Sequence, residues 1–162
     1  MRLQEAYIIA TRVKAELAPH CDAIELAGSI RRKMPEVNDI EIVCIPKPYN
    51  VGFFADGIAA VLDQWPKIRG YLPCKAAQRM LPEGIMLDLY TARPENWGLI
   101  LAVRTGSAEY SHQVLAKRWV RRGYESINGM LTLNGREIPV FTEQKLFDLI
   151  GLPYIKPERR II

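Results

Sequence analysis

Three carboxylates in apolar surroundings are the residues whose types and spacing suggest chemistry. Asp39 and Glu41 interrupt the apolar run DIEIVCIP (39–46), and Asp88 lies between two leucines in IMLDLYTA. Residues two apart in a strand point to the same face, so Asp39 and Glu41 form a pair, which Asp88 joins if the two strands are neighbours. Converging carboxylates repel one another unless cations lie among them, and oxygen ligands suit Mg²⁺ or Mn²⁺. The pair alone would equally suit the solvated face of a strand, but the third acid favours a metal site.

A short stretch ahead of these acids, GSIRR (28–32), is suited to hold phosphate. A glycine followed by a helical turn presents free backbone amides to an anion, and Ser29 and Arg32 add donors. On its own, the stretch would also fit a surface turn with two solvated arginines. Two divalent ions beside it would activate an attacking hydroxyl and stabilise a leaving oxygen, which is phosphoryl transfer. Gly-Ser, a spacer, acid-x-acid and a later third acid resemble the pattern of the nucleotidyltransferase superfamily.

The elements that must position these residues follow from hydrophobic periodicity. In the first part of the chain, helices are predicted at 3–18 and 57–65 and strands at 23–28, 39–46, 67–72, 75–81 and 85–92. The link between the first two strands is short, which suits antiparallel pairing. One mixed sheet with helices on one face fits this order.

A second, smaller α+β part is predicted to begin near Pro94. Its predicted elements are helices at 96–103, 107–122 and 143–152, a turn at Thr105-Gly106 and a hairpin at Asn134-Gly135. Thr142 suits the N-cap of the last helix and Gly151 its C-terminal stop. The whole chain therefore belongs to the α+β class.

Composition and charge place the chain among ordinary globular proteins with a polyanionic partner. It has 162 residues, 49% of them hydrophobic and 25% charged, with a net charge of +4. Five Lys or Arg residues lie between Arg104 and Arg122, where Glu109 is the only acid, so nucleic acid is the expected partner of this part. The three cysteines indicate neither a disulfide framework nor a zinc site. Without an expected signal peptide or membrane segment, we expect a cytoplasmic protein, and we expect a monomer.

Four motifs in the same order give the sequence a specific resemblance. GSIRRKMPEVNDIEIV, LDLYTA, RTGSAEYSHQVLAKRWVRRGY and TEQKLFDLIGLPYIKPERR together resemble the catalytic core of family X DNA polymerases, the group of DNA polymerase beta. The resemblance covers about residues 22 to 162. It implies a catalytic palm at 1–93, with the mixed sheet, and a small nucleotide- and DNA-binding thumb at 94–162.

Roles for individual residues are implied by this resemblance, position by position. The family's metal-binding and catalytic acids match Asp39, Glu41 and Asp88, with Asp88 as the base for the primer 3′-hydroxyl. Nucleotide-binding positions match Gly28, Ser29, Arg32, Asn38, Thr105, Gly106 and Ser107, and relatives with this turn imply a cis peptide between the last two. The helix that follows carries arginines suited to a DNA backbone, Arg118, Arg121 and Arg122, although a solvated basic face would look the same. Two Mg²⁺ ions, replaceable by Mn²⁺, are the implied cofactors.

The sequence departs from the family in two respects. Glu41 stands where the usual motif is Asp-x-Asp, which keeps the charge but lengthens one ligand arm by a methylene. The lyase and helix-hairpin-helix segments common in the family are not recognised, so we expect no cleavage of a baseless sugar and a weak grip on upstream DNA.

These observations predict a minimal DNA polymerase. It would add deoxynucleotides from their triphosphates to a primer 3′-hydroxyl, most simply in short gaps during DNA repair. A nucleotidyltransferase acting on a small molecule, RNA or protein would use the same palm and is the alternative, although RTGSAEY and YIKPERR favour the polymerases. A non-catalytic nucleic-acid binder is a third reading, against which the third acid argues.

Overall fold

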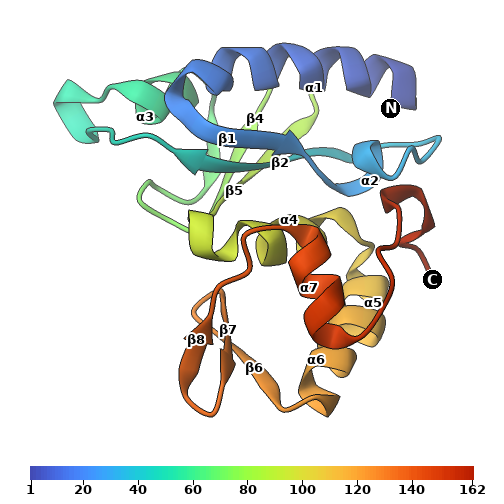
Figure 1. Cartoon of the computed structure of the whole chain (residues 1–162). Helices are drawn as coiled ribbons and strands as arrows, with labels where there is room; N and C mark the ends of the chain where they lie inside the picture. Colours follow the sequence, from blue (N-terminus) through green and yellow to red (C-terminus); the bar gives the residue numbers. More distant parts are fainter. The chain divides into compact units, whose positions relative to one another are not determined.

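The computed structural model describes all residues from 1 to 162 and divides into two compact units, Met1–Ala92 and Arg93–Ile162 (Figure 1). Each unit combines helices with its own sheet, which confirms the predicted α+β class. No helix has both the length and the apolar character needed to cross a bilayer.

Unit 1 is built on a five-stranded mixed sheet with the order β1-β2-β5-β4-β3. Its strands are β1 Cys21–Leu26, β2 Asp39–Pro46, β3 Lys67–Arg69, β4 Ala76–Met80 and β5 Met86–Thr91. The central strands β2 and β5 pair in parallel, and all other pairs are antiparallel. The five predicted strands are confirmed, each within a few residues.

Two helices cover one face of this sheet, α1 Leu3–Leu17 and α3 Gly57–Leu62 (Figure 1). In α1, small and branched apolar residues recur at helical spacing and are all buried, Ala6, Ala10, Val13 and Leu17. They share one apolar core with Ile40 and Ile42 of β2. Side chains alternate along a strand, so the residues between these isoleucines face away from the helices.

Unit 2 contains a helical layer and a three-stranded antiparallel sheet with the order β6-β7-β8. Its elements are α4 Trp97–Thr105, α5 Ala108–Tyr110, a π-helical segment Ser111–Ala116, α6 Lys117–Arg121, β6 Tyr124–Ile127, β7 Met130–Leu133, β8 Arg136–Ile138 and α7 Glu143–Ile150. The helix predicted at 107–122 is therefore three consecutive helical segments. Strand β6 was not predicted. Thr142 caps α7 by accepting from Lys145 N at 3.1 Å, and Gly151 ends it with φ +69°, which confirms both assignments.

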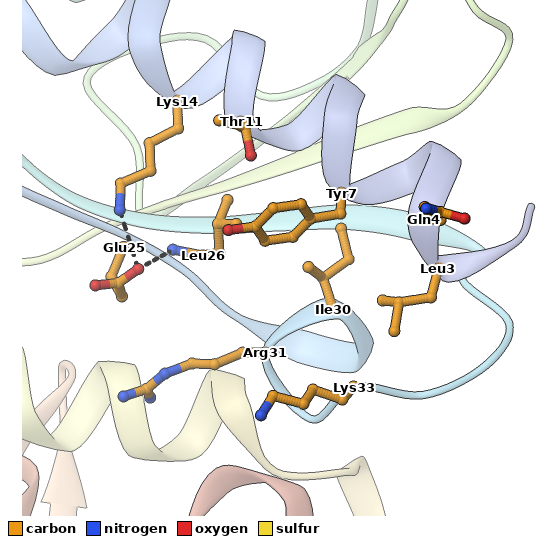
Figure 2. A pocket seen from close by; sticks show the side chains of 10 residues that line it. All are labelled: Leu3, Gln4, Tyr7, Thr11, Lys14, Glu25, Leu26, Ile30, Arg31 and Lys33. Carbon is orange, nitrogen blue, oxygen red and sulfur yellow. Dashed lines mark hydrogen bonds and ion pairs between the residues drawn. The ribbon is translucent and has the colours of Figure 1, made fainter.

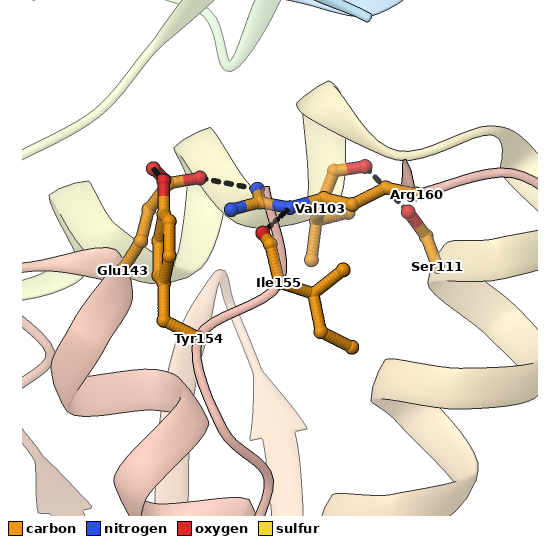
Figure 3. Close-up of polar contacts among 6 residues, drawn as sticks. All are labelled: Val103, Ser111, Glu143, Tyr154, Ile155 and Arg160. Carbon is orange, nitrogen blue, oxygen red and sulfur yellow. Dashed lines mark hydrogen bonds and ion pairs between the residues drawn. The ribbon is translucent and has the colours of Figure 1, made fainter. Parts of the chain in front are cut away.

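A buried ion pair fastens the C-terminal segment of unit 2 to α7 (Figure 3). The Arg160 side chain is fully buried, and its Nη1 donates to Glu143 Oε1 at 2.5 Å. Its Nε donates to the Ile155 carbonyl at 2.8 Å, and the guanidinium lies 5.1 Å from the centre of the Phe147 ring and 5.3 Å from that of Tyr154. A buried charge is tolerated only with such partners, so the C-terminal segment has a fixed position in this unit.

Removal of this buried arginine is expected to destabilise unit 2 strongly. Arg160→Met removes the cation that pairs with the buried Glu143 carboxylate, which costs about 3–5 kcal/mol. Arg12→Met is the matched control, because Arg12 forms ion pairs with Glu16 and Glu83 at the surface, and exposed pairs contribute about 1 kcal/mol or less. Urea unfolding followed by circular dichroism measures both losses of unfolding free energy. Equal losses would contradict the structural role of the buried pair.

Candidate active site

The register between β2 and β5 places three acids on one face of the sheet. Glu41 lies directly opposite Asp88 in the parallel ladder, and Asp39, two residues before Glu41, lies opposite Met86. Cross-strand partners and residues two apart share a face, so all three carboxylates lie on the face that α1 and α3 leave open. The prediction that the two acid-bearing strands are neighbours is confirmed.

The surroundings of Asp39 raise the pKa of its carboxyl. Partial burial raises the pKa of the Asp39 carboxyl, and the nearby Asp88 raises it further. A backbone hydrogen bond and the charge of Arg32 act in the opposite direction but do not cancel the rise. Burial also lowers the pKa of Arg32, while Glu41 and then Asp39 counteract that change. Arg32 is thus a cation close enough to interact with Asp39 and Glu41.

Two polar atoms beside this group are buried without a hydrogen-bond partner, Asp88 Oδ1 and Ser29 Oγ. Asp88 is 8% exposed, so water reaches its carboxylate poorly. Orphaned buried acceptors and donors are rare and indicate an unfilled interaction. A carboxylate oxygen fits a cation, and a serine hydroxyl fits a phosphate oxygen.

The donor set fits a divalent cation by its chemistry, because it consists of carboxylate oxygens on one face. No three Asp, Glu, His or Cys side chains are grouped closely enough to form a metal cluster. Asp39, Glu41 and Asp88 are therefore placed as candidate ligands by strand register, repulsion and the free Oδ1 atom, and their role as metal ligands stays a prediction.

Gly28 lies against the carboxylate of Glu41. A Cβ atom built on Gly28 would stand 1.6 Å from Glu41 Oε2 and 2.5 Å from its Cδ. Gly28 also has φ +56°, a left-handed conformation that other residues avoid. Next to it, Ala27 N donates to the Glu41 carbonyl at 2.8 Å. The turn into α2, Gly28–Arg31, is consequently shaped around the β2 acid, and only glycine fits there.

The other residues predicted to bind nucleotide occupy two places. Asn38 is exposed immediately before β2, in unit 1. In unit 2, Thr105 is the buried last residue of α4, and Gly106 follows in an extended conformation. Ser107 caps the next helix, because its Oγ accepts from Tyr110 N at 3.1 Å. The predicted cis peptide between Gly106 and Ser107 is wrong, since the chain has its one cis bond at Leu72-Pro73.

Sequence reasoning missed two residues that hold this turn, Arg160 and Ser111. The Arg160 carbonyl accepts from Ser107 N at 3.1 Å. Ser111 Oγ donates to the Val103 carbonyl at 2.7 Å (Figure 3). A Cβ on Gly106 would meet the Tyr110 ring at 2.7 Å and Ser111 Oγ at 2.9 Å, so the turn is tightly packed. Such contacts far apart in the chain leave no signal in local spacing.

The three arginines predicted to contact DNA differ in their surroundings. Arg118 is partly buried and donates to the Ile150 carbonyl at 3.1 Å and to the Gly151 carbonyl at 3.2 Å. It therefore caps the C-terminal end of α7. The Arg122 guanidinium lies over Gly151, and Arg121 is exposed. Of the three, Arg121 and Arg122 are the side chains that solvent reaches readily, and DNA contact stays a prediction for all of them.

Comparisons with known proteins match the sequence of the second unit and the fold of the whole chain. Residues 100–161 match the family model of the DNA polymerase beta thumb. Among solved structures, the chain is similar to polymerase beta of Leishmania infantum, in a ternary P/T complex, with 17% sequence identity and a TM-score of 0.74. This similarity covers 99% of the present chain and 76% of the other. No curated protein matches.

The resemblance to family X DNA polymerases that the motifs predict is confirmed by these two findings. The match of the second unit is a match of sequence to the thumb family, and the likeness of the whole chain is one of fold. The catalytic residues are identified by neither comparison, so their roles rest on the geometry of unit 1.

The contact between Gly28 and Glu41 gives a sharp test of the acid site. Gly28→Ala is expected to push the Glu41 carboxylate away and to lower the affinity for Mn²⁺ by about 10- to 100-fold, the usual effect of disturbing the support of a metal ligand. Isothermal titration calorimetry measures the affinity. Glu41→Asp, which shortens the side chain, should restore part of it in the double variant.

Gly84→Ala is the matched control for this test. Gly84 also has a left-handed conformation, with φ +77°, but nothing lies within 4 Å of a Cβ built there. Both substitutions cost about 1–2 kcal/mol of backbone strain, whereas only the first disturbs an acid. A loss of Mn²⁺ affinity in Gly84→Ala as large as in Gly28→Ala would show that the effect is general destabilisation.

Proposed function

We propose that this chain is a DNA polymerase that adds deoxynucleotides to a primer 3′-hydroxyl by two-metal phosphoryl transfer, filling short gaps in DNA repair. The observation that carries the proposal is the register of β2 and β5, which aligns Asp39, Glu41 and Asp88 on one open face. The thumb match over residues 100–161 and the polymerase-beta fold support DNA as the acceptor.

The side chains of unit 1 have distinct roles in this proposal. Asp39, Glu41 and Asp88 would hold Mg²⁺, which when bound neutralises triphosphate charge and makes the primer hydroxyl more acidic. Asp88 accepts the proton of that hydroxyl, because its Oδ1 is buried and has no other partner. Arg32 and the Ser29 hydroxyl bind the triphosphate and orient its α-phosphorus for in-line attack. Pyrophosphate leaves toward the same cationic group.

Unit 2 is the proposed binding surface for DNA and for the incoming sugar. The net charge of +4 lies entirely in Arg93–Ile162, where eleven basic residues face seven acidic ones. Unit 1 has equal numbers of both. A basic unit is the electrostatic requirement for holding a polyanion. The Thr105-Gly106-Ser107 turn, fixed by Arg160 and Ser111, is rigid enough to contact a nucleotide through its backbone.

Transfer to a non-DNA acceptor is the second candidate, because the palm chemistry is the same. Primer extension separates the two. The chain is incubated with gapped, nicked, open-template and single-stranded DNA, each deoxynucleotide in turn, and Mg²⁺ or Mn²⁺. Template-directed addition in the gap supports the polymerase, and labelling of RNA or of protein with no DNA extension would overturn it.

Neutral substitutions of the acids are expected to abolish addition without loss of stability. Asp39→Asn and Asp88→Asn remove several kcal/mol of transition-state stabilisation, which lowers the rate more than about 100-fold. Since the folded state raises the Asp39 pKa, it binds that proton more tightly than the unfolded chain, and ionised Asp39 destabilises the fold at neutral pH. Metal-free Asp39→Asn should therefore melt higher than wild type at pH 7. That advantage should vanish as the pH falls below the ordinary value of about 4.

The outcome that contradicts this assignment is full primer extension by either variant. Lower melting temperatures for Asp39→Asn, measured by circular dichroism without metal, would show that the acid stabilises the fold and is not held there against repulsion.

DNA affinity is expected to depend on Arg121 and Arg122 through charge alone. Alanine at both positions should reduce the magnitude of the slope of log affinity against log salt by about 1.8, which corresponds to two phosphate contacts. Fluorescence anisotropy on gapped DNA measures the slope. Arg118→Ala serves as the control, because that side chain is bonded to the end of α7 and its loss should lower stability more than the slope. An unchanged slope in the double variant would place the DNA elsewhere.

A further inference from the structure

Two neighbouring phenylalanines project into solvent from the loop between β2 and α3. Phe53 is 95% exposed and Phe54 is 81% exposed, and their rings contact each other edge to face with centroids 5.0 Å apart. Val51, beside them, is 50% exposed. Exposed large apolar groups that gather in one place mark an interaction site more often than a single exposed residue does.

Hydrogen bonds at its base hold this loop in shape. Asp56 Oδ1 accepts from Asn50 N at 2.6 Å, and Asp56 Oδ2 accepts from Asn50 Nδ2 at 2.7 Å. The backbone closes the same loop through Asp56 N to the Asn50 carbonyl at 3.2 Å and Ala55 N to the Gly52 carbonyl at 3.1 Å. We call residues 50–56 the aromatic loop. Its closed base presents the two rings in a fixed position, which lowers the entropy cost of binding.

The charges in and around the aromatic loop disfavour nucleic acid as its binding partner. Between Pro48 and Pro66 the sequence contains two acids, Asp56 and Asp63, and no Lys or Arg. Asp63 and Val51 line one small surface pocket, so this acid lies close to the loop. Arg79 lines the same pocket, but its side chain is buried and donates to backbone carbonyls. A phosphate backbone would be repelled there, whereas an apolar surface with a basic rim would be attracted.

Unit 1 itself has an apolar groove of this kind, with a volume of about 670 Å³ (Figure 2). Its apolar walls come from α1, β1 and α2. Leu3, Tyr7, Leu26 and Ile30 form them, and Tyr7 is 55% exposed. Three of the four charged residues that line the groove are basic, Lys14, Arg31 and Lys33, and the fourth is Glu25, which pairs with Lys14 at 3.1 Å. Its volume lies within the range of about 300–1,000 Å³ that binds drug-sized groups.

We propose that the aromatic loop of one chain binds in the groove of a second copy of the same chain. Figure 1 shows the loop next to α3 at one end of unit 1, and α2 with the N-terminus at the other end. A loop therefore cannot fill its own groove, and the contact joins different surfaces of two copies. In a pair joined by this head-to-tail contact, one copy still has a free groove and the other a free aromatic loop. Further copies can therefore add, and short open chains form. This proposal differs from the monomer expected from the sequence, which stays a prediction.

Sedimentation equilibrium of the full chain tests this proposal, independently of any polymerase activity. Because the contact is small, the weight-average mass should rise gradually from about 5 to about 500 µM, past that of a dimer. Two variants each remove one surface: Phe53→Ser with Phe54→Ser, and Tyr7→Glu, which places a negative charge in the groove. Each should remain a monomer throughout the range.

Matched controls use exposed residues outside both surfaces. Phe141→Ser replaces a phenylalanine that is 56% exposed in unit 2, and Ile8→Glu adds the same charge to α1 beside Tyr7 but outside the groove. Both should associate as the wild type does. Circular dichroism at each concentration shows that every variant is folded.

Mixing the two defective variants gives the decisive result. One retains its groove and the other its aromatic loop, so together they form one contact, and the mass should rise and stop at that of a pair. A wild type that stays monomeric at the highest concentration overturns the proposal, as does association that survives the phenylalanine substitutions. A groove used by DNA would give that same monomer, together with lower DNA affinity in Tyr7→Glu.

Discussion

The parallel register of β2 with β5 is the constraint on which the rest of unit 1 depends. Because side chains alternate along a strand, one register fixes which residues face the core and which face the open side. With Glu41 opposite Asp88, Ile40, Ile42 and the leucines of β5 pack under α1 and α3 while the acids share the other face. A slip by one residue would bury the acids and expose the core, so apolar packing enforces the geometry of the site.

Burial and repulsion between carboxylates both disfavour the ionised form of Asp39. Burial and Asp88 raise the Asp39 pKa, so the ionised group costs stability that the apolar face of the same strands must supply. Gly28 adds a second constraint, because its left-handed backbone leaves room for the Glu41 carboxylate and for nothing larger than hydrogen. Strained and repulsive features gathered at one place, beside an unpartnered Asp88 oxygen, are typical of a site prepared for a charged ligand.

Local pattern predicts much of this architecture, and its failures have physical causes. The strands of unit 1 and both ends of α7 follow from alternation and capping, which are properties of neighbouring residues. Strand β6 was overlooked although Asn128-Gly129, both with positive φ, is itself a hairpin signal, because its side chains are mostly exposed and show no apolar alternation. The role of Arg118 depends on contacts distant in sequence, which periodicity does not encode. The trans Gly106-Ser107 peptide differs from the cis bond that the family resemblance implies.

Arg160 connects the core of unit 2 with the turn that is expected to contact the nucleotide, through its side chain on one side and its backbone carbonyl on the other. Its side chain is buried against Glu143, Phe147 and Tyr154, so its backbone cannot move without breaking an ion pair. The same residue accepts from Ser107 N through its carbonyl. A buried ion pair contributes little net stability compared with apolar packing, but it is geometrically exacting. The ion pair therefore fixes the position of the Arg160 backbone more than it stabilises the fold. Through the hydrogen bond from Ser107 N, it also fixes the turn that is expected to contact the nucleotide.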